Sequence, residues 1–392
     1  TSGDTVFKFD MLFEISVPRP WEQGKEQRRF HEALDQAVFA EEMHFDTVWV
    51  VEHHFLTELA HSSAPDAWLG ALAARTDRIR LGFGVTLLPS QVNHPIRVAE
   101  RMATADIVSN GRLEVGTGRS SSPYQLEAFG VDVGTTREQW EESIKLLPRL
   151  WTEEDVTYEG RFWNWSDKVT VVPRPVQQPH PPLWVASTQP DTCRLAGEKG
   201  VGLLMTGIRA PELLAENIAV YKAASEQPID QVGMFQNNQA ALFTIGFCNE
   251  DDDKARLLGG QGGQWYVNRV NEIYKNDWRG TPLEAVPDSY RYHAKARSAG
   301  GGGNWATSLT ARPINDIIDS GAFCVGDPAS IIEKIKVYVE TGADRLVCVM
   351  QMADIRHEDQ MRSIELMGQE VIPAIRAWEQ QRSVAQPVGG SA

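Results

Sequence analysis

The amino-acid sequence predicts an α/β protein built as a single (β/α)8 TIM barrel. Eight short apolar segments recur along the 392 residues, and a segment with helical periodicity follows each of them. The 42% hydrophobic content supports a packed core, and no second compositional block interrupts the chain. A doubly wound parallel sheet shows the same alternation of strands and helices, so it remains the alternative fold.

The predicted strands are short buried segments of the kind found in parallel sheets. Residues 47–51 are all β-branched or aromatic, whereas residues 80–89 are apolar but contain two glycines, which indicates a close approach to the backbone. In chain order the predicted strands cover residues 8–17, 47–51, 80–89, 113–119, 183–186, 202–206, 240–247 and 345–350.

The predicted helices carry apolar residues at helical spacing between recognisable ends. One helix opens at His94-Pro95, with proline at the first helical position, and stops at Asn110-Gly111. In chain order the predicted helices cover residues 26–43, 64–74, 95–109, 136–151, 191–199, 211–226, 328–340 and 357–378. A stretch rich in Trp and Pro, residues 163–182, is expected to be irregular.

A long insertion is expected between the seventh and eighth strands, over about residues 255–322. Glycine runs at 259–263 and 300–303 interrupt its helical pieces, so the segment could be a hinged lid or a slack linker. The barrel with this insertion would occupy residues 1–380. Residues 381–392 would form a disordered tail.

Composition excludes several classes of function. A net charge of -15 argues against binding nucleic acid or an anionic membrane through bulk charge, and no apolar run is long enough to span a bilayer. The chain has no signal-peptide pattern, and its four cysteines show no CxxC spacing. We therefore expect a cytoplasmic protein with free buried thiols.

Three ionisable residues, Glu52, His53 and His54, follow the predicted strand 47–51 directly. Charged groups are costly to bury, so they should lie at the carboxyl end of the strand, where barrel enzymes build their sites. Adjacent strand residues point to opposite sides, and no third ligand accompanies the two histidines, so no metal site is predicted. His53 or His54 suits acid–base work, and Glu52 could fix the histidine tautomer.

Two loops carry features that suit a phosphate group. Arg119 follows Gly116-Thr-Gly118, which offers open backbone amides and one guanidinium. Ser187, Thr188 and Thr192 bring hydroxyl groups to the start of a predicted helix, although N-capping and turn formation also explain them. The glycines at 116 and 118 do not match a nicotinamide-binding turn, because the third glycine is missing and no helix begins there.

Residues 45–55, Phe-Asp-Thr-Val-Trp-Val-Val-Glu-His-His-Phe, resemble the second strand of the bacterial luciferase-like monooxygenase family, which are flavin-dependent (β/α)8 enzymes. The resemblance spans residues 7 to about 378. It continues through Gly82–Pro89, His94-Pro95 with Ala99-Glu100, Gly111-Arg112, Gly118-Arg119, Val185-Ala186-Ser187 and Gly326-Asp-Pro328.

The resemblance implies a monooxygenase that uses reduced FMN (FMNH2) and O2 through a flavin C4a-hydroperoxide. The implied substrate is an apolar organic molecule such as an aldehyde or a ketone. A separate flavin reductase would supply FMNH2, and the chain would form a homodimer. The sequence does not distinguish a fatty aldehyde from a terpene ketone or a biosynthetic intermediate.

The resemblance also assigns positions around the flavin ring. His53 matches the family's catalytic histidine, and Glu52 is expected to hold it. Gly84-Val85 falls where the family has a non-prolyl cis peptide beneath the ring. Luciferase has its reactive thiol at the position of Gly118, so light emission is not implied here.

The phosphate end of the flavin is assigned in the same way. Arg119 matches the family's phosphate-binding arginine, while Ala186, Ser187 and Thr188 fall where members hold the phosphate through side chains and amides. Thr192, in the first turn of the helix that follows, belongs to the same expected site. Luciferase has a glutamate at the position of Ser187, so that contact is not conserved residue for residue.

Two other functions stay open. A relative within the same superfamily uses a reduced deazaflavin for hydride transfer and needs no O2. A non-catalytic flavin-binding subunit is the other alternative, and the retention of His53 and Arg119 argues against it.

Overall fold

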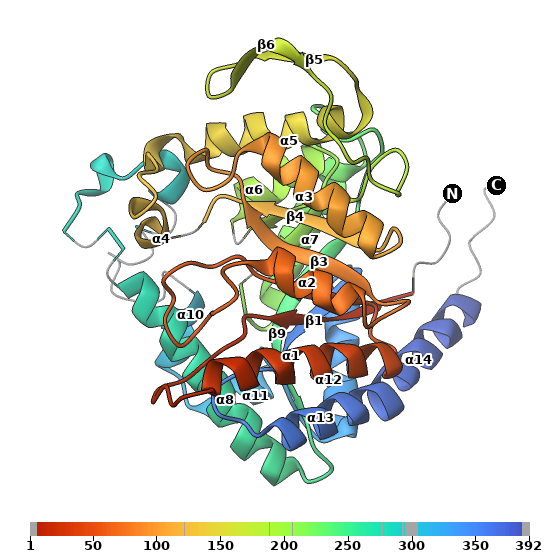
Figure 1. The fold of residues 1–392 in the computed structure, drawn as a ribbon. Helices are drawn as coiled ribbons and strands as arrows, with labels where there is room; N and C mark the ends of the chain where they lie inside the picture. Colours follow the sequence, from red (N-terminus) through yellow and green to blue (C-terminus); the bar gives the residue numbers. More distant parts are fainter. Residues whose placement is uncertain are drawn as a thin grey trace.

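A parallel β-barrel closed on itself forms the centre of the structure (Figure 1). The computed structural model describes residues 6–120, 122–187, 189–205, 207–275, 277–278, 280–291, 294 and 305–385. The barrel strands are β1 (Lys8–Phe13), β2 (Thr47–Val50), β3 (Arg80–Leu87), β4 (Leu113–Gly118), β7 (Leu183–Ser187), β8 (Gly202–Met205), β9 (Ala240–Cys248) and β11 (Arg345–Val349). Pairing runs from β1 in this order to β9, then to β11, which returns to β1. This closure confirms the barrel and excludes the doubly wound sheet.

Three strand segments differ from the predictions. A further strand, β10 (Phe323–Gly326), pairs with β9 beside the barrel. The stretch rich in Trp and Pro contains an antiparallel hairpin of β5 (Val156–Glu159) and β6 (Asn164–Val169), which Figure 1 shows beyond α5 (Thr136–Thr152). The first strand ends at Phe13 instead of residue 17, so Glu14 lies at its carboxyl end.

Helices surround the barrel in the expected alternation with the strands (Figure 1). The first half of the chain contributes α1 (Lys25–Glu42), α2 (Pro65–Ala73), α3 (Pro95–Val108), α4 (Pro123–Glu127) and η1 (Val133–Thr135). Next come α6 (Pro190–Glu198), η2 (Pro211–Leu213), α7 (Ala215–Ser225), α8 (Asp252–Lys275) and η3 (Leu283–Ala285). The remainder are α10 (Trp305–Thr310), α11 (Ile314–Asp319), α12 (Pro328–Glu340), α13 (His357–Leu366), the π-helix η4 (Met367–Val371) and α14 (Ile372–Ala385).

Helix ends follow the local chemistry of the sequence. The His94 side chain accepts a hydrogen bond from the Ile96 amide at 3.2 Å and so caps α3, as its His-Pro start predicted. Helix α14 continues to Ala385 and includes the first residues of the expected tail, whereas residues 386–392 lie outside the described part. Among the described helices, none is long and apolar enough to cross a membrane.

The glycines at 259–263 do not interrupt a helix, contrary to the prediction. Helix α8 runs through them without a break, because they let it pack closely on the strands beneath. A Cβ at Gly259 would lie 2.6 Å from Phe247 Cβ, and one at Gly263 would lie 2.5 Å from the Phe323 ring. These glycines therefore make room for neighbours and are not hinges; the second glycine run, 300–303, lies outside the described residues.

The barrel interior below the site is filled by two tryptophans and a charged cluster. The rings of Trp49 and Trp184 meet edge to face, with centroids 5.5 Å apart. Their indole N–H groups donate to Asp10 and Glu114, at 2.9 and 2.6 Å. The guanidinium of Arg345 lies 3.0 Å from Asp10 and 3.9 Å from Glu114, so the buried carboxylates share one cation.

The four cysteines, Cys193, Cys248, Cys324 and Cys348, are buried free thiols, as the sequence predicted. Burial raises the pKa of Cys193 and of Cys324 to about 11, and that of Cys248 to about 12. It raises the pKa of Cys348 well above its ordinary value. Such thiols act as small apolar side chains of the core.

Candidate active site

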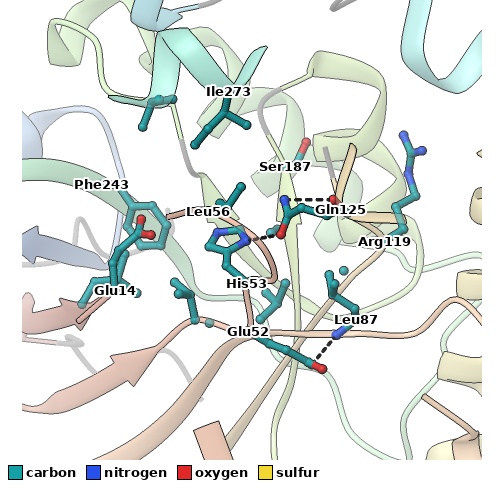
Figure 2. Close-up of a pocket in the computed structure, with 18 of the residues that line it drawn as sticks. Glu14, Glu52, His53, Leu56, Leu87, Arg119, Gln125, Ser187, Phe243 and Ile273 are labelled. Atoms are coloured by element: carbon teal, nitrogen blue, oxygen red, sulfur yellow. Dashed lines mark hydrogen bonds between the residues drawn. The ribbon is translucent and has the colours of Figure 1, made fainter. Parts of the chain in front are cut away.

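A pocket opens at the carboxyl ends of the barrel strands and encloses about 1300 Å³ of space, its open mouth included (Figure 2). Helix α8 and the segment after it cover one side through Tyr266, Val270, Ile273, Tyr290 and Trp305. The lining includes each predicted site residue that the structure describes, namely Glu52, His53, Gly84, Val85, Arg119, Ala186, Ser187 and Thr192. Thr188 lies outside the described residues.

The Gly84–Val85 peptide bond is cis, as the family resemblance implied. Strand β3 bulges at this point, because its register to β4 shifts between Phe83 and Thr86. Both residues of the cis bond line the pocket.

His53 is oriented by Gln125, a residue of the short helix α4. The amide oxygen of Gln125 lies 3.0 Å from His53 Nδ1 and accepts the backbone N–H of His54 at 3.1 Å. A backbone amide can only donate, so this second contact identifies the oxygen of the Gln125 side chain. His53 Nδ1 must therefore carry a proton, and Nε2 of the neutral ring is a base.

Glu52 does not hold His53, and this corrects the predicted pairing. Its carboxylate accepts hydrogen bonds from Thr86 Oγ1, from the Leu87 amide and from Asn93 Nδ2, all within 2.9 Å. The nearest imidazole recorded for it is that of His54, whose Nε2 lies 3.5 Å away, longer than a well-formed hydrogen bond. Alternation of side chains along the extended chain explains why Glu52 pairs with His54 and His53 faces elsewhere.

The environment keeps Glu52 ionised. Burial alone would raise the pKa of this carboxyl group, but the nearby His54 and the hydrogen bonds from Asn93, Leu87 and Thr86 lower it below its ordinary value. These hydrogen bonds connect the residue after β2 to β3 and to the loop that follows β3. Glu52 therefore has a structural role that holds these segments of the site together.

Arg119 presents a cation to the opposite end of the pocket. Its guanidinium donates to Thr136 Oγ1 at 3.2 Å and to the Ser289 carbonyl at 2.7 Å, and it lies 4.3 Å over the Tyr290 ring. Among the described residues no carboxylate forms an ion pair with it. Burial lowers the pKa of Arg119, yet a guanidinium stays charged at neutral pH.

The start of α6 lies at this same pocket, and the amides of Thr192 and Cys193 there donate to the Gln189 carbonyl. Ser187 Oγ accepts the Gln189 amide at 3.1 Å, which shapes the loop between β7 and the helix. Ser187, Gln189 and Thr192 line the pocket together with Arg119. A helix N-terminus beside an unpaired guanidinium is suited to bind an anion such as phosphate.

Sequence reasoning missed several polar residues of the pocket, Gln125 and Glu14 among them. Gln125 gave no local signal, since nothing near it in sequence links it to His53. Glu14 did give one: it follows the apolar run 11–13 as Glu52 follows 47–51, but the strand was predicted to continue to residue 17.

Glu14 is a buried carboxyl group with only one oxygen satisfied. Its Oε1 accepts a hydrogen bond from the Tyr266 hydroxyl at 2.6 Å, while Oε2 has no hydrogen-bond partner among the described residues. The side chain is 4% exposed and lines the pocket. Burial raises the pKa of Glu14, and the charge of His53 and the Tyr266 hydrogen bond act in the opposite direction.

Fold and pocket together are those of a (β/α)8 barrel with a candidate active site at the carboxyl ends of its strands. The sequence model of the luciferase-like monooxygenase family matches residues 11–345, so the chain belongs to this family.

Relatives of two kinds resemble the chain. The oxygenase component of a flavin-dependent trigonelline monooxygenase from Acinetobacter baylyi is 31% identical over 268 residues, which are 67% of this chain and 71% of that protein. An F420-dependent glucose-6-phosphate dehydrogenase from Nakamurella multipartita is 28% identical over 352 residues, 88% of this chain and 93% of that protein. The crystal structure of monooxygenase RslO1 from Streptomyces bottropensis superposes with a TM-score of 0.74 at 26% identity, covering 94% of this chain and 99% of RslO1. The family thus supports an oxidoreductase with a flavin-type cofactor, FMN or F420.

Proposed function

We propose that the protein is the oxygenase of a two-component monooxygenase, which uses FMNH2 and O2 through a flavin C4a-hydroperoxide to insert one oxygen atom into an organic substrate. The observation that carries this proposal is the pocket itself, which combines an anion-binding end at Arg119 with a histidine of defined tautomer at His53. Reduced FMN would supply the electrons that activate O2.

Arg119 and the start of α6 would hold the FMN phosphate. The guanidinium at present donates to the Ser289 carbonyl, a neutral acceptor that a phosphate oxygen would outcompete. Ala186, Ser187 and Thr192 line the same pocket as Arg119. The ring would then rest against Gly84 and Val85.

His53 would move or hold a proton at Nε2 while the substrate reacts. Gln125 fixes the ring by accepting from Nδ1, and Glu52 keeps the backbone at this point attached to β3. Tyr266, Val270 and Ile273 of α8 cover the pocket with mostly apolar surface. Such a cover excludes water, which limits unproductive release of peroxide.

A separate flavin reductase is part of the proposal, and the relative from Acinetobacter baylyi supports it because that protein is named as an oxygenase component. The homodimer expected from the family stays a prediction. Light scattering on the purified chain should give twice the mass of one chain; a mass equal to one chain would contradict it.

A second function is favoured by the F420-dependent relatives, of which the one from Nakamurella multipartita matches 88% of the chain, against 67% for the trigonelline enzyme. In that case a reduced deazaflavin would transfer hydride, and O2 would not be needed. The same pocket residues would hold the cofactor phosphate, so the geometry alone does not separate the two.

An anaerobic titration with FMNH2, followed by rapid admission of O2, separates them. The proposal predicts tight binding and a long-lived oxygenated flavin spectrum. Weak FMNH2 binding with tight F420 binding would instead establish hydride transfer.

Arg119→Ala should weaken FMN binding by at least about tenfold, since one charged hydrogen-bonding partner is lost. Arg97→Ala, which removes an exposed guanidinium far from the pocket lining, is the matched control.

His53→Ala tests the catalytic role separately. The variant should bind FMN normally, because the phosphate end is unchanged, but should release H2O2 instead of oxygenated product. Full coupling of O2 use to product formation in this variant would remove His53 from the mechanism.

A further inference from the structure

We propose that Glu14 forms a subsite for a positively charged nitrogen of the substrate, so that the pocket prefers flat cationic nitrogen compounds over neutral molecules of the same shape. This inference rests on the proposed function, because it takes Arg119 to be matched by a cofactor phosphate. It narrows the substrate from an apolar organic molecule to a chemical class.

The geometry of Glu14 is the first step. Its Oε1 is engaged by the Tyr266 hydroxyl at 2.6 Å, and its Oε2 is buried without a hydrogen-bond partner in the described part of the chain. An unpaired buried carboxylate is costly, because it has lost its water and gained no compensating group. A ligand that brings a positive charge to Oε2 would remove this cost.

The charges of the pocket lining are the second step. Glu52 also lines the pocket, but three hydrogen bonds and His54 already satisfy it. Arg119 would be matched by phosphate. In Figure 2 Glu14 lies beside Phe243 on the side of His53 away from Arg119. Among the described lining residues this leaves Glu14 as the carboxylate with an oxygen, Oε2, that has no hydrogen-bond partner, and His53 as the nearby group able to carry a compensating charge.

The surroundings of Glu14 are the third step. Phe243, Tyr266 and Trp305 contribute aromatic rings to the lining, and Leu12 and Leu59 contribute apolar surface. Aromatic faces attract cations, and a carboxylate among them recognises a nitrogen cation without needing several hydrogen bonds. A flat, cationic heteroaromatic ring fits this combination of charge and apolar walls.

The test compares two probes that share a shape and differ in charge, N-methylpyridinium and toluene. Both are titrated by calorimetry into the full chain, with and without oxidised FMN. The wild type should bind N-methylpyridinium at least about tenfold more tightly than toluene, as expected for one charge-assisted contact. Glu14→Gln keeps the shape of the side chain and should abolish this preference, with less than about threefold change for toluene.

Tyr266→Phe provides a matched second variant. Loss of the hydroxyl removes a hydrogen bond that favours the ionised carboxyl, so the pKa of Glu14 rises further. Binding of N-methylpyridinium should then set in at a higher pH than in the wild type, while toluene binding stays unchanged. His53 also faces this region in both proteins.

Each outcome of these titrations either supports the cation subsite or contradicts it. Equal affinity of the wild type for both probes, or a cation preference that survives Glu14→Gln, would overturn the inference. Binding that favours a neutral carbonyl probe and strengthens as the pH falls would show that Glu14 acts as a neutral hydrogen-bond donor instead. A cation preference in a protein that binds no FMN would refute the proposed function and leave the subsite standing.

Discussion

Three consecutive residues of the site have separate tasks because their side chains alternate in direction. Glu52 turns toward β3 and bonds Leu87 and Asn93, while His53 turns toward Gln125 and the pocket. The backbone N–H of His54 fixes the amide that orients His53. The order Glu-His-His thus combines one support, one imidazole that faces the pocket and is the proposed catalytic group, and one backbone donor.

Glu52→Gln should destabilise the fold at neutral pH by about 3 kcal/mol, since several hydrogen bonds to a charged acceptor weaken together. The pKa of Glu52 is lowered below its model-peptide value of 4.5, so its contribution is fully present above that pH and is lost as the pH falls through the lower, folded value. Urea unfolding of the variant and the wild type at several pH values measures how the stability contribution of Glu52 depends on pH. The difference between variant and wild type should shrink on acidification; a constant difference would contradict the role of the charge.

The predicted site residues within the described part all line the pocket, whereas their hydrogen-bond partners could not be predicted. Glu52, His53 and Arg119 follow predicted strands, and the carboxyl ends of barrel strands meet in one place. The bond from His53 to Gln125 joins residues 72 positions apart, and the bond from Tyr266 to Glu14 spans 252 positions. Contacts of this range depend on how loops fold over the barrel, and no local pattern records them.

At the scale of single elements, glycines decide how closely neighbours pack. The sequence indicated a close approach within the third strand, and the structure identifies the neighbour. A Cβ at Gly82 of β3 would lie 2.2 Å from the Trp49 ring, which is itself tied to Asp10. The ring cannot move without breaking that hydrogen bond, so only glycine fits.

Gly82→Ala should therefore destabilise the protein by about 1–3 kcal/mol through overpacking. Gly70→Ala in α2 is the matched control, because a Cβ there meets nothing within 4 Å. The control should stabilise by about 0.5–1 kcal/mol, as alanine does inside a helix. The midpoints of urea unfolding of the two variants test this difference in stability. Equal effects of the two substitutions would show that the contact with Trp49 is unimportant.

Helix α8 shows where element prediction failed. Its glycine run was interpreted as a break because glycine weakens isolated helices by about 1 kcal/mol per residue. Contacts with Phe247 and Phe323 outweigh that weakness. Local propensity was a sound guide to α3, whose ends carry their own capping signals, but not to a helix that tertiary packing supports.

At the scale of the whole molecule, Arg345 helps to close the barrel. It lies on β11 and contacts Asp10 on β1, Thr47 on β2 and Glu114 on β4, so one side chain links four strands of the barrel, from the first to the last in the sequence. Removing it would leave the buried Asp10 carboxylate without its cation, while Glu114 would keep its ion pair with Arg80.

Arg345→Met should cost about 3–5 kcal/mol at neutral pH, the usual penalty for breaking a buried ion pair from one side. Arg97→Met, which removes an exposed pairing with Glu100, should change stability by no more than about 0.5 kcal/mol. Urea unfolding of both variants and the wild type measures the two changes in the free energy of unfolding. A small effect of Arg345→Met would mean that the Asp10 carboxylate takes up a proton in the folded barrel.

Cofactor binding should also be visible in the stability of the whole chain. FMNH2 at 100 times its dissociation constant adds about 2.7 kcal/mol, which corresponds to roughly 3 °C in melting temperature for a protein of this length. An anaerobic thermal melt measures the shift. Arg119→Ala should show a smaller shift at the same FMNH2 concentration, and an identical shift would remove Arg119 from the phosphate site.

The buried cysteines have a consequence for the lifetime of the proposed oxygenase. Thiolates, not thiols, react with peroxide, and a thiol with a pKa of about 11 is ionised in roughly one molecule in ten thousand at pH 7. The folded protein therefore withstands the oxidant that its own side reaction would release. Oxidation by peroxide should begin instead at exposed methionine thioethers such as that of Met234. Methionine sulfoxide at such a surface position leaves the barrel intact.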